Sequence, residues 1–286
     1  MPLETIRRPP GPSPAVRTGR KARLHSVFER TLHDNRRALT WWSVGMVLLA
    51  GYSLAFFPTV SGNTSMRKLV DSYPEALRKL MAIRDFTTGP GYLQAYLFSF
   101  MAPILLLMVA LLHGSDATSG EEDRGTIDIL LSCPISRSRV VLEKFAAITA
   151  GLALLAAALL ATLLVGGPLV GLDVAVNRVV AVCAASLLLA VDIGALALFV
   201  GAATGRRGLA RGVSAAVAVA SYLVSGLADV ASGLRPVRPL SLYYHSLGIQ
   251  PLFTGFSLLH TAVLVAVAAV LVVLAAVSFE RRDLCR

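Results

Sequence analysis

Residues 119–144 read SGEEDRGTIDILLSCPISRSRVVLEK and lie between two long apolar runs of the chain. Ser119 and Glu122, three positions apart, form a capping box, and acidic side chains fill the first turn, where the helix dipole favours negative charge. Pro134 ends this helix, because the residue before a proline avoids the helical conformation. The stretch therefore predicts a short amphipathic helix beside a membrane, joined to a second helix that leads back into it.

The composition of the chain is that of a membrane protein. Its 286 residues are 55% hydrophobic and 15% charged, with a mean hydropathy of +0.68. The net charge of +10 would suit nucleic acid, but Lys and Arg stand at the ends of apolar runs, as they do at a bilayer surface. We therefore expect a lipid bilayer as partner and no nucleic acid. The three cysteines have no CxxC spacing, so neither a metal site nor a disulfide framework is predicted.

Six apolar runs are long enough to cross a bilayer, which takes roughly 20 residues in a helix. The predicted spans are residues 38–60, 92–112, 145–170, 179–203, 212–234 and 258–279. The expected fold is an all-α polytopic membrane protein with six transmembrane helices, and residues 119–144 fall between the second and the third.

Three further segments flank the spans. Residues 1–22 are rich in Pro, Gly and Arg, which predicts a disordered basic N-terminus. Residues 23–37 carry apolar side chains at helical spacing with Arg on the other faces, which predicts an interfacial amphipathic helix. Residues 235–257 contain three prolines and are too polar to span, so short re-entrant or external helices are expected before the sixth span.

The basic residues predict the orientation of the chain. An even number of spans places both termini on one side, and most Lys and Arg fall on that side: before the first span, in residues 115–144, in residues 205–211 and in the tail. By the positive-inside rule this side is cytoplasmic. We expect a multi-pass plasma-membrane protein with both termini in the cytoplasm.

The order of residues in the 119–144 loop is specific: an acidic pair, Arg-Gly-Thr, two leucines, Pro, Arg and then Lys. It resembles the cytoplasmic loop of ABC-2 type transporter permeases. The residues that carry the resemblance are Glu121, Glu122, Arg124, Gly125, Thr126, Leu130, Leu131, Pro134, Arg137 and Lys144.

The resemblance implies a function for the chain. Residues 38–286 would be an ABC-2 type transmembrane domain, and the loop would hold a coupling helix that docks in a cytoplasmic ABC ATPase subunit, present in two copies. A second permease, identical or related, would complete the pathway. The expected task is ATP-driven export of a hydrophobic or amphipathic compound, such as a drug, an antibiotic or a lipid.

The chain itself is not expected to be an enzyme or to bind a cofactor. It contains no GxxxxGK[ST] motif and so cannot hold ATP phosphates in a P-loop; ATP and Mg would bind the partner ATPase. The 205–211 segment is expected to be a topogenic basic loop, with a second, smaller ATPase contact as the alternative.

Two other functions stay open. Permeases that resemble this chain also serve in the maturation of copper enzymes. A different class would be an intramembrane aspartyl hydrolase that uses Asp192 and Asp229, two acids at membrane depth. The GxGD pattern of such hydrolases is absent, since residues 226–229 read GLAD. We therefore expect no catalytic residue, and interpret both acids as candidates for lining a polar pathway.

Overall fold

The computed structural model describes residues 27–61, 63, 72–74, 88–117, 136–228 and 231–281, which form helices and no strand. Six helical segments among them are long and apolar enough to cross a membrane, which confirms the predicted architecture. They are α1 (Val27–Val60), the continuous run of α4 (Gly89–Tyr92), η1 (Leu93–Met101) and α5 (Ala102–Asp116), then α8 (Arg137–Leu169), α9 (Val176–Thr204), α10 (Arg207–Leu227) and α12 (Leu258–Arg281).

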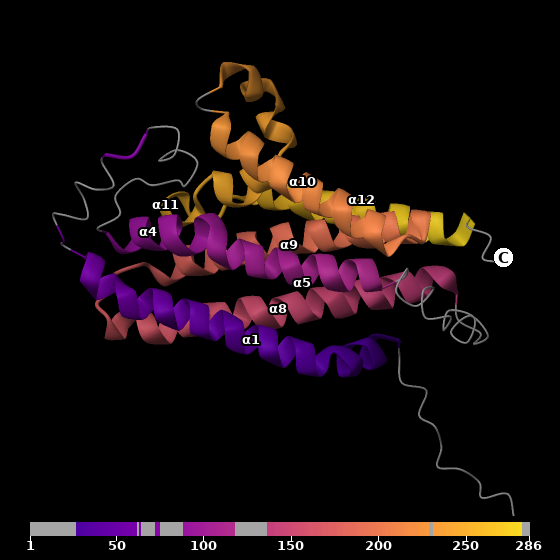
Figure 1. Cartoon of the computed structure of the whole chain (residues 1–286), viewed down its shortest axis with the longest axis horizontal. Coiled ribbons are helices and arrows are strands. Elements are labelled where there is room, and N and C mark those ends of the chain that lie inside the picture. Colours follow the sequence, from indigo (N-terminus) through magenta and orange to yellow (C-terminus); the bar gives the residue numbers. More distant parts are fainter. Residues whose placement is uncertain are drawn as a thin grey trace, which may run out of the picture.

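Helix α9 is the centre of the bundle. It packs against α5, α8, α10 and α12, whereas α1 packs mainly on α8. Figure 1 shows α1 and α8 along one side of the molecule and α10 and α12 along the other. Small residues bring α5 and α9 together, because a Cβ atom on Gly114 would lie 2.6 Å from the carbonyl oxygen of Gly194. Close approach of this kind stabilises helix pairs in a membrane through van der Waals contact.

Helix α1 is continuous from Val27 to Val60. The end of the predicted interfacial segment, residues 23–37, therefore belongs to the same helix as the first span. The cause is visible in the sequence, because residues 27–37 contain neither Gly nor Pro to end the helix. Residues 23–26 lie outside the described residues, and the interfacial location of this segment stays a prediction.

Helix α10 begins earlier than the predicted fifth span, residues 212–234. Gly205 adopts a left-handed conformation with φ 64°, and its N–H donates to the carbonyl of Gly201 at the end of α9. This glycine cap completes the turn within two residues, so α10 starts at Arg207. The predicted basic loop 205–211 is wrong in this respect: most of it is the first part of a helix.

Three short helices separate α10 from α12. They are η2 (Ser232–Leu240), η3 (Tyr244–Gly248) and α11 (Pro251–Thr254). The fifth span ends at Leu227 rather than at residue 234, and the chain is in a separate 3₁₀ helix, η2, where Pro236 and Pro239 lie. The structure thus has a broken run of helices where the sequence predicts one, and their external location stays a prediction.

Tyr243 anchors this broken run to the second span. Pro103 has no N–H to donate to the carbonyl of Ser99 four residues earlier, and the hydroxyl of Tyr243 donates to that carbonyl at 2.8 Å. Burial raises the pKa of Tyr243, so the phenol keeps the proton that this hydrogen bond needs.

Candidate functional site

The end of the bundle where α5 ends and α8 begins, here called the loop end, flanks the segment that carries the sequence motif. Lys144 of α8 is 2% exposed, and its Nζ donates to the carbonyl oxygen of Ala117, the residue after α5. A buried ammonium group is costly unless it is hydrogen-bonded. Lys144 therefore fastens the start of α8 to the end of α5, on either side of the motif segment.

Asp116, the last residue of α5, joins that helix to α10. Its Oδ2 accepts from Nη2 of Arg207 at 2.8 Å, and its Oδ1 accepts from Nη2 of Arg211 at 2.9 Å. Nε of Arg211 also donates to the hydroxyl of Ser115 at 2.9 Å. These side chains are about one-third exposed, so water screens the pairs. Their shared geometry nevertheless fixes the end of α5 against the first turns of α10.

Glu143 of α8 connects that helix to the start of α1. Its Oε2 accepts a hydrogen bond from the backbone N–H of Phe28 at 3.2 Å, and its Oε1 accepts from Nε of Arg139 at 2.8 Å. The first N–H groups of a helix have no partner within the helix, so Glu143 caps α1 from a neighbouring element. The hydroxyl of Ser138 donates to Glu280 near the end of α12. Helices α1, α5, α8, α10 and α12 are thus cross-connected at the loop end.

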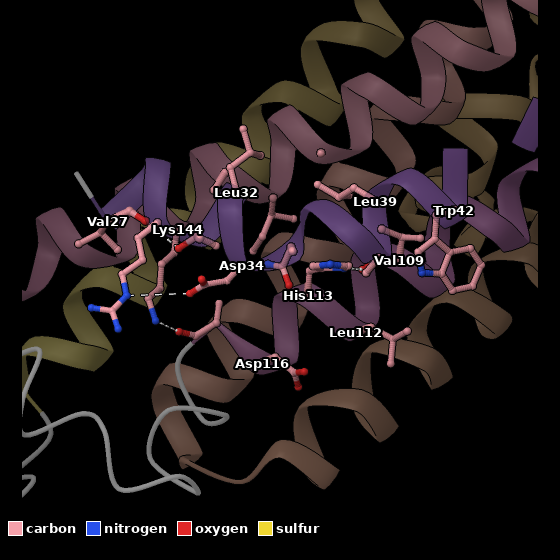
Figure 2. Close-up of a pocket in the computed structure, with 18 of the residues that line it drawn as sticks. Val27, Leu32, Asp34, Leu39, Trp42, Val109, Leu112, His113, Asp116 and Lys144 are labelled. Carbon is pink, nitrogen blue, oxygen red and sulfur yellow. Dashed lines mark hydrogen bonds and ion pairs between the residues drawn. The ribbon is translucent and has the colours of Figure 1, made fainter. Parts of the chain in front are cut away.

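A cavity of about 660 Å³ opens between α1, α5, α8 and α10 at the same end. Figure 2 shows Asp34, Lys144 and Asp116 toward one part of it and Leu112, Val109 and Trp42 toward another. The cavity is therefore polar near the ends of the helices and apolar farther along them.

Comparison with protein-family models gives a match to the ABC-2 family transporter protein model over residues 26–284. The chain belongs to the ABC-2 transporter family. A comparison with curated proteins found no significant match. As an ABC-2 family member, the chain is a multi-pass membrane permease subunit of an ABC transporter, and it associates with an ABC ATPase rather than being that ATPase.

The structure describes two of the ten ABC-2 motif residues. Arg137 is the first residue of α8, and Lys144 lies two turns farther along that helix. The other eight lie outside the described residues: Glu121, Glu122, Arg124, Gly125, Thr126, Leu130, Leu131 and Pro134. The coupling helix therefore stays a prediction. The structure does describe the contacts on either side of it, those of Asp116 at the end of α5 and of Lys144 in α8.

Of the two acids that the sequence predicts at membrane depth, Asp192 lies inside the helix bundle and Asp229 lies outside the described residues, beyond the end of α10 at Leu227. The side chain of Asp192 is fully buried in α9, and it faces the backbone of Ala268 in α12. Among the described residues neither of its carboxylate oxygens has a hydrogen bond of normal geometry. The structure does not bring Asp192 to the cavity at the loop end.

Sequence reasoning singled out the basic segment 205–211 but missed Asp116 and its pairing with Arg207 and Arg211. A signal was present, because each of the three residues lies next to a predicted span on the same predicted side of the membrane. The sequence places these charges at one end of the permease, but it does not give the rotation of each helix. Rotation decides which charges meet, so the pairing becomes visible only in the packed bundle.

Proposed function

We propose that this permease subunit exports a hydrophobic or amphipathic compound, and that two copies of a separate ABC ATPase drive it through residues 119–144. A second permease, identical or related, completes the pathway. The complex lies in the plasma membrane with both termini of the chain in the cytoplasm. The family match and the motif residues support this proposal.

The observation that carries the proposal is the pair of attachments on either side of the motif segment. Asp116 ties the end of α5 to α10, and Lys144 ties the start of α8 to α5. A force applied to residues 118–135 would therefore reach the three spans that contain α5, α8 and α10. Mechanical input of this kind is what a permease without its own ATPase needs.

The proposed cycle begins when ATP and Mg bind the two partner ATPases and close them against each other. Their closure moves the coupling helix of each permease, which the resemblance places at residues 119–132. The two six-helix subunits then rock between inward-facing and outward-facing states, and hydrolysis resets them. In this cycle the chain supplies the pathway and the docking surface, and the partner supplies the chemistry.

The test of docking is reversal of the acidic pair, Glu121→Lys with Glu122→Lys. The double variant should insert into the membrane at normal levels and lose co-purification with the ABC ATPase subunit, because reversing two charges on a docking surface removes its electrostatic complementarity to the partner. Asp173→Lys is the matched control, since Asp173 is exposed at the opposite end of the bundle and should retain the ATPase. Full retention by the double variant would refute docking through this loop.

No observation favours either alternative function. A hydrolase would need Asp192 to reach water and substrate, yet its side chain is fully buried. A maturation permease for copper enzymes would share the fold and the ATPase, so only its cargo distinguishes it. An assay that follows which compounds stimulate ATP hydrolysis by the complex separates export from maturation. Loss of activity in Asp192→Asn without any ATPase requirement would instead favour the hydrolase.

A further inference from the structure

The cavity at the loop end has a polarity gradient along the helix axes. Its charged lining residues lie near the ends of their helices: Arg30 and Asp34 early in α1, Asp116 last in α5, Lys144 in the early turns of α8, and Arg207 and Arg211 in the first turns of α10. Its apolar lining lies deeper. The main apolar residues are Leu39, Trp42, Val109, Leu112 and Ile148. Val109 precedes Asp116 by seven residues, or about 10 Å of helix. Figure 2 shows the same separation, with Asp116 and Lys144 away from Trp42.

The charged part of the cavity has a positive surplus. Among the residues that the structure describes, four cationic side chains line it, and two anionic ones oppose them. Asp34 lies 3.9 Å from Arg30, and Asp116 is shared between Arg207 and Arg211. One carboxylate cannot neutralise two guanidinium groups. Because Arg207 and Arg211 are both more than one-third exposed, their uncompensated charge is available to a ligand.

We propose that this cavity binds an amphipathic anion, with its acidic head at Arg207 and Arg211 and its apolar chain along Leu39, Trp42 and Val109. Basic pockets between membrane helices attract acidic head groups, and the volume of about 660 Å³ lies in the range of small-molecule sites. The ligand is either an anionic phospholipid of the bilayer or a free single-chain acid. This binding does not depend on export or on the ATPase.

The protein contains its own reporter for this site. The chain has two tryptophans: Trp42 lines the cavity, and Trp41 beside it is 75% exposed on the outer surface of the bundle. The variant Trp41→Phe leaves Trp42 as the single fluorophore, and Trp42→Phe leaves Trp41. The pair separates quenching inside the cavity from quenching by surrounding lipid.

The first experiment places the full-length Trp41→Phe chain in phosphatidylcholine nanodiscs and adds dibrominated phosphatidylglycerol or dibrominated phosphatidylcholine. Brominated phosphatidylglycerol should reach half-quenching of Trp42 at about a fivefold lower mole fraction, as expected for one net ionic contact. The Trp42→Phe chain should show no preference between head groups, because Trp41 reports on bulk lipid. Equal quenching of Trp42 by the two lipids, together with a negative result in the second arm, would overturn the proposal.

Charge variants in the Trp41→Phe background locate the preference. Arg211→Gln removes one cation, and Asn35→Asp adds an anion to the lining without touching the Asp116 contacts, so it remains informative if Arg211→Gln folds poorly. Both should lower the preference for the acidic ligand several-fold. Arg37→Gln removes an exposed cation outside the cavity and should leave the preference unchanged. A preference that survives both cavity variants would overturn the assignment to this site.

A second arm distinguishes the two sources of the ligand. Doxyl-labelled stearic acid and its methyl ester are compared in nanodiscs that contain only neutral lipid. Preferential quenching by the acid identifies a single-chain amphipath as a ligand, whereas preference for brominated phosphatidylglycerol alone identifies a bilayer lipid. If neither acid is preferred over its neutral counterpart, the cavity does not select amphipathic anions.

Discussion

Asp116 shows how one carboxylate can link the motif segment to the bundle, because it ends α5 and holds both Arg207 and Arg211 of α10. The variant Asp116→Arg should reduce transport-coupled ATP hydrolysis about tenfold or more, since it places three cations together. Binding of the ATPase should persist, because the acidic pair at Glu121 and Glu122 is untouched. The readouts are co-purification and ATP hydrolysis in proteoliposomes.

The charge swap Asp116→Arg with Arg211→Asp provides the control. It restores an acid between two cations in the same cluster, so ATP hydrolysis should recover in part. If the double variant is no more active than Asp116→Arg alone, the ion-pair cluster does not carry the coupling.

Tyr243 provides a residue-scale test of the connection between the short helices and the second span. Tyr243→Phe removes the side-chain donor to the Ser99 carbonyl, to which Pro103 has no N–H to donate. The loss should lower the free energy of unfolding by about 1 kcal/mol, measured by denaturant titration in detergent. Tyr244→Phe is the matched control, and an equal loss in that variant would show that the hydrogen bond has no special role.

At the scale of elements, the contact between α5 and α9 limits how large the facing residues can be. Gly114→Ala would place a methyl group 2.6 Å from the Gly194 carbonyl oxygen, so the helices must separate at a cost of about 1–3 kcal/mol. Gly212→Ala in α10 meets no atom within 4 Å and should stabilise the helix slightly, because alanine is the better helix former. Comparison of the two unfolding free energies by denaturant titration checks the packing, and equal effects would contradict it.

The number and type of elements could be predicted from the sequence because a membrane span is defined by a local property, an apolar run of sufficient length. The fifth span shows the limit. Its start depends on Gly205, which adopts a left-handed conformation and caps α9. This cap makes a two-residue turn between α9 and α10 possible, and hydropathy does not distinguish such a turn from a longer loop. The broken run at 232–254 was predictable, since its prolines exclude a continuous helix.

Less of the candidate site than of the fold could be predicted from the sequence. The motif residues lie within one short stretch of sequence, so they could be predicted from their order alone, and eight of the ten stay a prediction. The pairing of Asp116 with Arg211 and the closure of α5 on α8 by Lys144 depend on helix rotation, which no single sequence specifies. The cavity could not be predicted either, because its lining comes from four helices and their rotations decide which side chains face it.

At the scale of the whole molecule, docking of residues 119–144 on a cytoplasmic ATPase requires that these residues and Asp173 lie on opposite sides of the membrane. Asp173 lies between α8 and α9, at the end opposite the start of α8. Single cysteines at positions 122 and 173, in a chain whose Cys133, Cys183 and Cys285 are replaced by serine, report the two sides separately. The reagent is a membrane-impermeant maleimide, applied to sealed vesicles with or without the ABC ATPase subunit.

The decisive measurement is the labelling of Glu122→Cys in such vesicles. Position 122 should be labelled only from the side that holds the ATPase, and bound ATPase should protect it, while Asp173→Cys should be labelled from the other side and should not be protected. Labelling of both positions from one side, or of position 122 at the same rate with and without the ATPase, would contradict this docking.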